Sequence, residues 1–165
     1  MRDKTCCFSG HRAIRDDKKD IIIARTEILI RKLILKRGIR FFGVGGALGY
    51  DYICAMILLR LRATDFPHIK VILIYPFEGY QSKWTQEQKD MYAQIWDKFD
   101  KRVCVSEVGN NEAFLARNRH MVNHSSVLVC YYDQHRSRSG TGQCVRYAKH
   151  QALEVHNVAE SDTFR

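Results

Sequence analysis

The sequence predicts an α/β protein: a Rossmann-like, doubly wound domain with a mostly parallel sheet of five or six strands and helices on both faces. Short apolar runs, typical of buried strands, alternate five times with longer amphipathic stretches, typical of helices. Glycines stand where several of these strands end. Parallel neighbours need crossover connections, which are helices in such folds. Without a linker or repeat in 165 residues, we expect one domain over residues 1–158 and a flexible tail over 159–165.

The first strand is expected over residues 4–9, and a long amphipathic helix over residues 16–36. Asp16 or Asp17 is the candidate cap of this helix. Its expected buried stripe consists of Ile21, Ile22, Ala24, Ile28, Leu29, Leu33 and Leu35.

The stretch IRFFGVGGALGYD, residues 39–51, is the centre of the prediction. An apolar strand ends in four glycines, and a helix that contains Asp51 begins directly after them and runs to about Arg62. A glycine turn leaves backbone N–H groups uncovered, and a helix N-terminus adds partial positive charge. The turn therefore predicts a phosphate site at Gly45, Gly46 and Gly49, although glycines also serve close helix packing.

The third strand is expected around residues 71–74 and ends at Pro76; a helix with Trp84, Met91, Ile95 and Trp96 on its packed side follows. A fourth short strand over residues 101–106 and a helix over residues 110–124 come next. Residues 125–132 form the clearest strand, and the polar loop that begins at Asp133 leads to a helix after Gly140-Thr141-Gly142. Residues 154–158 are expected to add an edge strand.

The composition excludes some classes of protein. No run reaches the roughly 18 apolar residues that cross a bilayer, and no signal-peptide core follows Met1, so we expect a cytoplasmic protein without a membrane partner. The six cysteines show no CxxC spacing, which favours free thiols. A formal net charge of +9 makes nucleotide or nucleic-acid partners plausible.

Several polar residues follow strand ends, where open α/β sheets bind their ligands. His11 and Arg12 come directly after Gly10. Gly140, Thr141 and Gly142 open the last helix and form a second candidate phosphate cradle, with the Thr141 hydroxyl as an additional donor. No metal site is predicted, because His120 and His124 share a helix face without a third ligand at a recognisable spacing.

Four motifs together resemble the SLOG superfamily, in particular its small stand-alone YpsA-like members. These motifs are TCCFSGHR, FFGVGGALGYD, YPF, and SGTG followed by VRYA. The resemblance spans nearly the whole chain, and the TCxFxGHR opening is its specific part. The superfamily includes DNA-processing proteins and the LOG phosphoribohydrolases, which release a base from a nucleoside monophosphate; other members are thought to bind nucleotide-derived signals.

The resemblance implies binding more clearly than catalysis. Gly140-Thr141 is similar to the GT of the LOG motif GGxGTxxE, but Cys144 stands where that motif has its glutamate. Arg117 is similar to the LOG arginine that contacts the phosphate end. Pro76 belongs to the YPF motif and Asp133 to the loop after the fifth strand, and both complete the expected ligand-binding set.

Three hypotheses follow. The first is a domain that binds or senses a nucleotide-like small molecule, with no obligatory cofactor beyond such a bound nucleotide. The second is an enzyme that cleaves an N-glycosidic bond, for which Asp51, Glu78 and Asp133 are the candidate carboxylates. The third is a module that binds single-stranded DNA, for which the sequence shows no recognisable nucleic-acid-binding signature. The sequence leaves open whether the chain forms a homo-oligomer.

Overall fold

The computed structural model describes residues 1–136 and 139–160 of the chain. The strands are β1 (Thr5–Gly10), β2 (Phe41–Val44), β3 (Lys70–Tyr75), β4 (Lys101–Cys104), β5 (Val127–Tyr131) and β6 (Glu154–Asn157). The helices are α1 (Asp16–Arg37), α2 (Tyr50–Ala63), α3 (Gln86–Ala93), α4 (Asn111–Asn123) and α5 (Gly140–His150). Short 3₁₀ turns lie at η1 (Arg2–Lys4) and η2 (Trp96–Lys98). Residues 161–165 of the expected tail lie outside the described residues.

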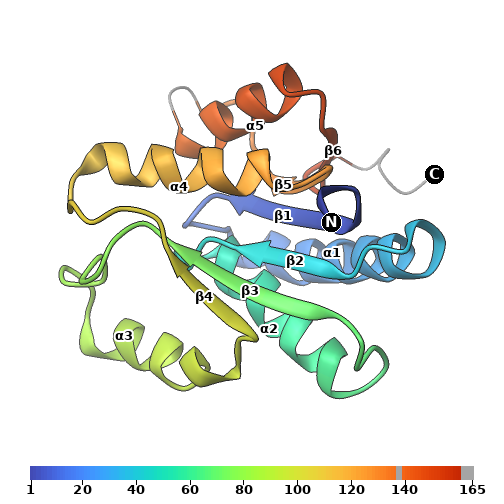
Figure 1. Cartoon of the computed structure of the whole chain (residues 1–165), viewed down its shortest axis with the longest axis horizontal. Helices are drawn as coiled ribbons and strands as arrows, with labels where there is room; N and C mark the ends of the chain where they lie inside the picture. The colour runs from blue at the N-terminus through green and yellow to red at the C-terminus, as the bar shows by residue number, and fades with distance from the viewer. Residues whose placement is uncertain (137–138, 161–165) are drawn as a thin grey trace.

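The six strands form one sheet in the order β4-β3-β2-β1-β5-β6, and every neighbouring pair is parallel. Helices α1, α2 and α3 lie on one side of the sheet, and α4 and α5 lie on the other (Figure 1). The fold is therefore the predicted Rossmann-like α/β fold. The chain winds outward from β1 to β4 and then returns to the other side of β1 at β5, so the strand order reverses between β1 and β5.

Each face of the sheet has its own apolar core. On the α1–α2 side, buried side chains of both helices, including Ile30, Leu33 and Leu58, pack with strand residues such as Phe8 and Phe42. On the other side, α4 and α5 cover Cys7, Leu128 and Cys130 with residues that include Val122 and Ala148. All six cysteines are free.

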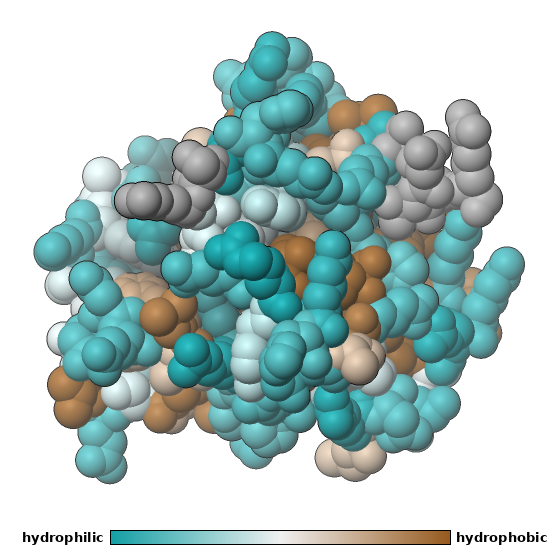
Figure 2. All heavy atoms as spheres, turned by 90° about the horizontal axis from the view of Figure 1, so that it is seen from above, coloured by the Kyte–Doolittle hydropathy of each residue, from teal (hydrophilic) through white to brown (hydrophobic). Residues whose placement is uncertain are grey.

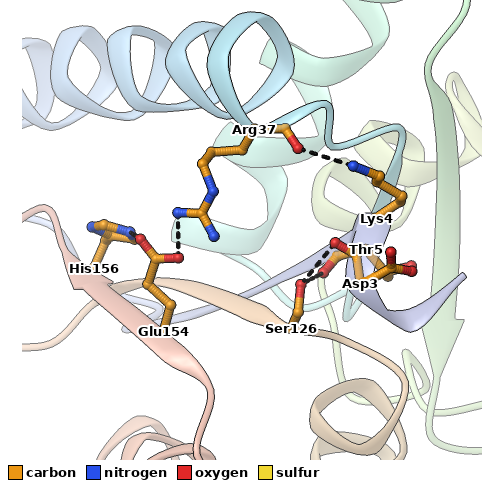
Figure 3. Close-up of polar contacts among 7 residues, drawn as sticks. All are labelled: Asp3, Lys4, Thr5, Arg37, Ser126, Glu154 and His156. Atoms are coloured by element: carbon orange, nitrogen blue, oxygen red, sulfur yellow. Dashed lines mark hydrogen bonds and ion pairs between the residues drawn. The ribbon is translucent and has the colours of Figure 1, made fainter.

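Polar contacts tie the amino edge of the sheet to the end of α1 (Figure 3). Arg37 Nη1 lies 2.6 Å from Glu154 Oε2, and His156 Nε2 lies 2.8 Å from Glu154 Oε1. Burial alone would raise the pKa of Glu154, but the hydrogen bonds from Arg37 and His156 hold that pKa below its ordinary value. Lys4 Nζ donates to the Arg37 carbonyl oxygen at 3.4 Å. Side chains at the amino edge of the sheet are therefore bonded to the end of α1 within the same chain.

The prediction for α1 was wrong in two respects. The residue before its first turn is Arg15, and neither Asp16 nor Asp17 caps the helix through its side chain. The two aspartates lie in the first turn, where negative charge suits the helix dipole. Of the expected buried stripe, Ile22, Leu29 and Leu33 are buried, but Ile21, Ala24, Ile28 and Leu35 are exposed. The buried side of α1 also contains Thr26, Ile30 and Ile34, which were not in the predicted stripe.

The face formed by α4 and α5 is mostly hydrophilic, with small separate hydrophobic patches (Figure 2). In the part of the chain that the structure describes, none of the helices is long and apolar enough to cross a membrane.

Candidate ligand-binding site

The loops expected to bind a ligand all leave the same edge of the sheet. Because the strands are parallel, the chain after Gly10 of β1, Val44 of β2 and Tyr131 of β5 emerges at the carboxyl edge. The strand order reverses between β1 and β5, and ligands of open α/β sheets bind at such a reversal. We call the region at this edge between the loops after β1, β2 and β5 the crevice. Each of the five helices that the structure describes follows a strand and begins at this edge, and α2 and α5 are the two that begin at the candidate glycines.

A carboxylate and a guanidinium meet at Gly45, in the turn after β2. A Cβ atom on Gly45 would lie 2.8 Å from Asp51 Oδ2 and 2.9 Å from Arg117 Nη1. Both side chains are buried, with exposed fractions of 5% for Asp51 and 7% for Arg117. Arg117 Nη1 donates to the Gly45 carbonyl oxygen, and Arg117 Nε donates to Asn118 Oδ1 at 2.8 Å. Gly45 therefore leaves room for this pair of charges, which a larger residue would displace.

Among the described residues, the second amino group of Arg117, Nη2, has no protein acceptor. Since no fully buried side-chain N or O atom in that part of the chain lacks a partner, Nη2 is open to solvent. A guanidinium that is anchored by two of its nitrogens and open at the third is suited to bind an anion.

Asp51 is held in a setting that disfavours its charge. Burial raises the pKa of Asp51 above its ordinary value, although the charge of Arg117, the hydrogen bond from Ala47 N–H at 3.2 Å and the charge of Arg12 all act to lower it. The folded state thus binds the Asp51 proton more tightly than the unfolded chain does. The protonated Asp51 side chain stabilises the fold at low pH, and this stabilisation is lost as the pH rises from 3.8 through the raised pKa. At neutral pH, the ionised carboxylate therefore lowers the free energy of unfolding.

We therefore expect Asp51→Asn to raise the melting temperature at neutral pH by a few degrees and to flatten the dependence of stability on pH in the acid range. Asp97→Asn, at a carboxylate whose side chain is 95% exposed, is the matched control and should change neither. Melting followed by circular dichroism from pH 4 to pH 8 measures both effects. A lower melting temperature for Asp51→Asn at neutral pH would show that the carboxylate stabilises the fold instead.

The N-terminus of α5 carries donors that have no acceptor among the described residues. Ser139 caps the helix, since its Oγ accepts a hydrogen bond from Gly142 N–H at 2.9 Å and its carbonyl oxygen accepts one from Gln143 N–H. Within the described residues, the N–H groups of Gly140 and Thr141 have no acceptor, and neither has the Thr141 hydroxyl, although Thr141 is only 6% exposed. A Cβ on Gly140 would meet nothing within 4 Å. These donors are available to an anion.

Cys144 lies one turn after Thr141 on α5 and connects this helix to the charge pair. Burial raises the pKa of Cys144 to about 11, and the charge of Asp51 raises it further, while a hydrogen bond from Ser9 and the charge of Arg117 lower it. Ser9, Asp51, Arg117, Thr141 and Cys144 thus belong to one neighbourhood, which we call the polar cluster. The Cys144 thiol stays neutral there.

His11 and Asp133 join the loops after β1 and β5. Asp133 N–H donates to His11 Nε2 at 2.9 Å, and burial lowers the pKa of His11, so its ring is a neutral acceptor. The Asp133 carboxylate accepts a hydrogen bond from His135 N–H at 3.0 Å, which lowers the pKa of Asp133. Arg12 is exposed, yet its charge acts on Asp51. His11 therefore fixes the shape of the crevice, while the side chains of Arg12 and Asp133 remain at its rim.

Three of the candidate glycines are required by close packing within the protein. A Cβ on Gly10 would lie 2.4 Å from the Tyr50 ring, and one on Gly49 would lie 2.1 Å from the Arg12 carbonyl oxygen. Gly46 has φ +76°, and its Cβ would lie 2.6 Å from the Tyr80 hydroxyl. Gly10 and Gly49 let α2 approach β1 and the loop after it, and Gly46 makes room for Tyr80.

Sequence reasoning missed the tyrosines that hold the turn after β2. The hydroxyl of Tyr80 donates to the Gly46 carbonyl oxygen at 2.9 Å, and the hydroxyl of Tyr92 donates to that of Ala47. Neither position carries a sequence signal, because both contacts join segments more than 30 residues apart. Pro76 lies buried at the end of β3, and its carbonyl oxygen accepts a hydrogen bond from Ser106 N–H at 2.9 Å, which ties the loops after β3 and β4 together.

A hollow of about 600 Å³ lies beside the end of β5, between that strand and the first turns of α1. Its walls include Lys18, Arg25, Tyr132, Asp133 and Glu160.

His120 and His124 lie elsewhere, on α4, where their rings stack with centroids 4.2 Å apart. Within the described residues, no group of three His, Cys, Asp or Glu side chains is arranged to hold a metal ion.

The fold and the polar cluster define a Rossmann-like domain with a candidate ligand site at its switch point. The family model described as the YspA SLOG family (YpsA) matches residues 8–162, and the chain belongs to this family. The resemblance to the SLOG superfamily is thereby confirmed.

Two relatives are similar to this chain over most of its length. The SPbeta prophage-derived protein YoqJ of Bacillus subtilis (strain 168) is 31% identical over 155 residues, which cover 84% of this chain and 86% of YoqJ. A UPF0398 protein of Levilactobacillus brevis is 31% identical over 121 residues, which cover 71% of this chain and 62% of that protein.

A solved structure of DNA processing protein A from Helicobacter pylori, described with a single-stranded DNA binding mode, has a similar fold. The TM-score is 0.60 at 21% sequence identity, over 93% of this chain and 65% of that chain. The present chain thus spans slightly less than two thirds of that structure, and the likeness concerns the fold.

Proposed function

We propose that this protein binds a nucleotide-derived small molecule, a nucleoside phosphate, at the carboxyl edge of its sheet. The observation that carries the proposal is a set of donors without a protein acceptor in the described residues: Arg117 Nη2, the Thr141 hydroxyl and the N–H groups of Gly140 and Thr141. Open donors at a helix N-terminus, beside a guanidinium that is anchored at its other nitrogens, favour an anionic ligand. Membership of the SLOG family supports the same class of ligand.

The phosphate would lie between the N-terminus of α5 and Arg117. Asp51, the carboxylate of the polar cluster, would accept hydrogen bonds from hydroxyl groups of the sugar, and the turn at Gly45-Gly46 would bring backbone close to it. Arg12, at the rim, adds positive charge to attract the ligand. His11 would act through the shape of the crevice, since its Nε2 is already bonded to Asp133 N–H.

Single-stranded DNA is the second candidate. The net charge of +9 and the fold shared with DNA processing protein A favour it. DNA would use the same donors for its backbone phosphates, but it would also need exposed basic residues beyond the cluster. Its binding would therefore weaken steeply with salt, whereas binding of a nucleoside monophosphate would depend on salt only mildly.

The test is isothermal titration calorimetry with AMP for the wild-type protein and for Thr141→Val, which removes the hydroxyl and nearly keeps the volume. We expect Thr141→Val to weaken AMP binding by roughly tenfold, the effect of one hydrogen bond to a charged group. Thr64→Val, at a hydroxyl that donates to the Arg60 carbonyl oxygen at the far end of α2, is the control and should not change the affinity.

Three further measurements separate the alternatives. Native mass spectrometry of the purified protein reports any retained nucleotide. A salt titration with a labelled oligonucleotide tests single-stranded DNA. Chromatography of the AMP mixture for free adenine tests cleavage of the N-glycosidic bond, which would use Asp51 as the carboxylate of the cluster. No AMP binding and no retained nucleotide, together with salt-dependent DNA binding, would replace the first candidate by the second.

A further inference from the structure

The outward face of α1 carries apolar side chains where a surface helix normally has polar ones. Ile21, Ile28 and Leu35 are 48%, 48% and 71% exposed. Seven large hydrophobic side chains are exposed in the part of the chain that the structure describes, and these three lie on one line along one helix. Isolated apolar residues on a surface are ordinary, but a row of them along one helix face points to an interaction surface.

The spacing of this line is that of a coiled coil. Ile21, Ile28 and Leu35 are seven residues apart, so successive side chains drift by only about 20° around the helix. Ala24 lies three residues after Ile21 and is also exposed, which gives the a and d positions of a heptad. Arg31, at the next d position, is held by Glu27 and Asp65 of its own chain. We call Ile21, Ala24, Ile28 and Leu35 the α1 seam.

Ala24, Ile28 and Leu35 of the seam face away from the protein, while Ile21, near the start of the helix, borders the hollow beside the end of β5. The buried residues of α1, such as Ile22, Leu29 and Leu33, contact the sheet and α2 from the opposite side of the helix. Helix α1 is the longest helix in the described part of the chain, with 22 residues, and extends along the long axis of the molecule (Figure 1). Because Ile28 and Leu35 are exposed, a second helix can approach along most of the seam.

The charges beside the seam select the partner. Lys18, Arg25 and Lys32 lie along one flank, at e positions, and Asp20 and Glu27 lie along the other, at g positions. In a parallel pair of identical helices, each g residue faces an e residue of the second copy five positions further on. Asp20 then faces Arg25 of the second copy, and Glu27 faces Lys32. An antiparallel pair would place the basic flanks against each other.

The cross-pairs would be partly organised before association. Arg25 Nη1 donates to the Val158 carbonyl oxygen at 3.1 Å, and Glu27 accepts hydrogen bonds from Arg31 and Arg60. The cross-pairs would share Arg25 and Glu27 with these partners in the same chain, so we expect them to fix the direction of packing and to add little to the affinity. A membrane surface fits less well, because acidic residues along one flank would be repelled by anionic lipids.

We propose that the α1 seam is a self-association surface on which two copies of this chain pack in a parallel, two-fold arrangement. Ile21, Ile28 and Leu35 would each meet the same residue of the second copy, and the charged flanks would fix the direction. The inference concerns a face of the molecule that the ligand site does not use, so it stands or falls independently of nucleotide binding.

The test is the oligomeric state of the full chain by analytical ultracentrifugation over a range of concentrations. The wild-type protein should be a dimer at concentrations approaching about 0.1 mM. Ile28→Glu, which puts two charges at the centre of the interface, should weaken dimerisation by roughly 100-fold or more. Val108→Glu introduces the same charge at an apolar side chain that is 62% exposed elsewhere, and should leave the dimer intact.

Disulfide trapping then tests the direction, in a Cys104→Ser background that removes the exposed thiol. Ile21→Cys alone should cross-link under mild oxidation in a parallel dimer, as should Leu35→Cys alone. Cross-links that form only when Ile21→Cys and Leu35→Cys proteins are mixed would overturn the parallel arrangement. A wild-type protein that stays monomeric, or a dimer that Ile28→Glu does not weaken while its melting temperature is unchanged, would overturn the proposal itself.

Discussion

Gly49→Ala is expected to lower the free energy of unfolding by roughly 3 kcal/mol or more, a large part of the stability of a domain of this size. Gly49 precedes α2 and has φ +76° and ψ −121°, a combination that L residues avoid. A Cβ there would also lie 2.1 Å from the Arg12 carbonyl oxygen, closer than any real contact. Because that oxygen is backbone, relief would require the loop after β1 to move away from α2. Equilibrium denaturation followed by circular dichroism measures the loss.

Gly79→Ala is the matched control. Gly79 also has positive φ, +82°, but a Cβ there would meet nothing within 4 Å. Its substitution isolates the cost of backbone strain, about 1 kcal/mol. The difference between the two variants is then the cost of the close approach between Gly49 and Arg12. Equal losses for both variants would mean that the loop after β1 can move away from α2 at little cost, which would contradict this expectation.

The fold could be predicted from the sequence because its signals are local. The apolar run that ends at Tyr132 and the glycines after Val44 mark strand ends without reference to the rest of the chain. The buried side of α1 could not be predicted in the same way, because apolar residues occur on both sides of that helix. Only the packed structure shows that Ile30 faces the core and Ile28 faces outward.

The sequence predicts which loops form the candidate site, but it does not predict the structural role of each residue in them. Gly45 and Gly49 look alike in the sequence, yet one makes room for Asp51 and Arg117 and the other lets backbone approach backbone. That distinction depends on α2 and α4, whose contacts with the turn are set by the sheet. Arg117 was found through the family resemblance; its burial and its bond to the Gly45 carbonyl oxygen come only from the structure.

Arg117→Gln is expected to reduce AMP affinity by roughly 100-fold, the effect of a lost charge-assisted hydrogen bond together with a lost buried charge. The glutamine side chain is shorter than that of arginine and does not reach the Gly45 carbonyl oxygen, so the variant also removes that contact, and its melting temperature is measured together with its affinity. Arg119→Gln makes the same change in net charge two residues further along α4, at an exposed arginine, and should alter the affinity by less than about twofold. Titration calorimetry of both variants compares the two positions directly.

The double variant Asp51→Asn/Arg117→Gln separates a role in binding from a role in folding. Without Arg117, the buried Asp51 carboxylate loses the charge that acts most strongly to lower its pKa, so Arg117→Gln alone should also lower the melting temperature at neutral pH. Adding Asp51→Asn removes the uncompensated carboxylate and should restore much of that stability, since the two groups are coupled through the space beside Gly45. AMP binding should remain lost. Recovery of binding together with stability would show that Arg117 serves only to balance Asp51, and the phosphate would then have to be bound by the N-terminus of α5 alone.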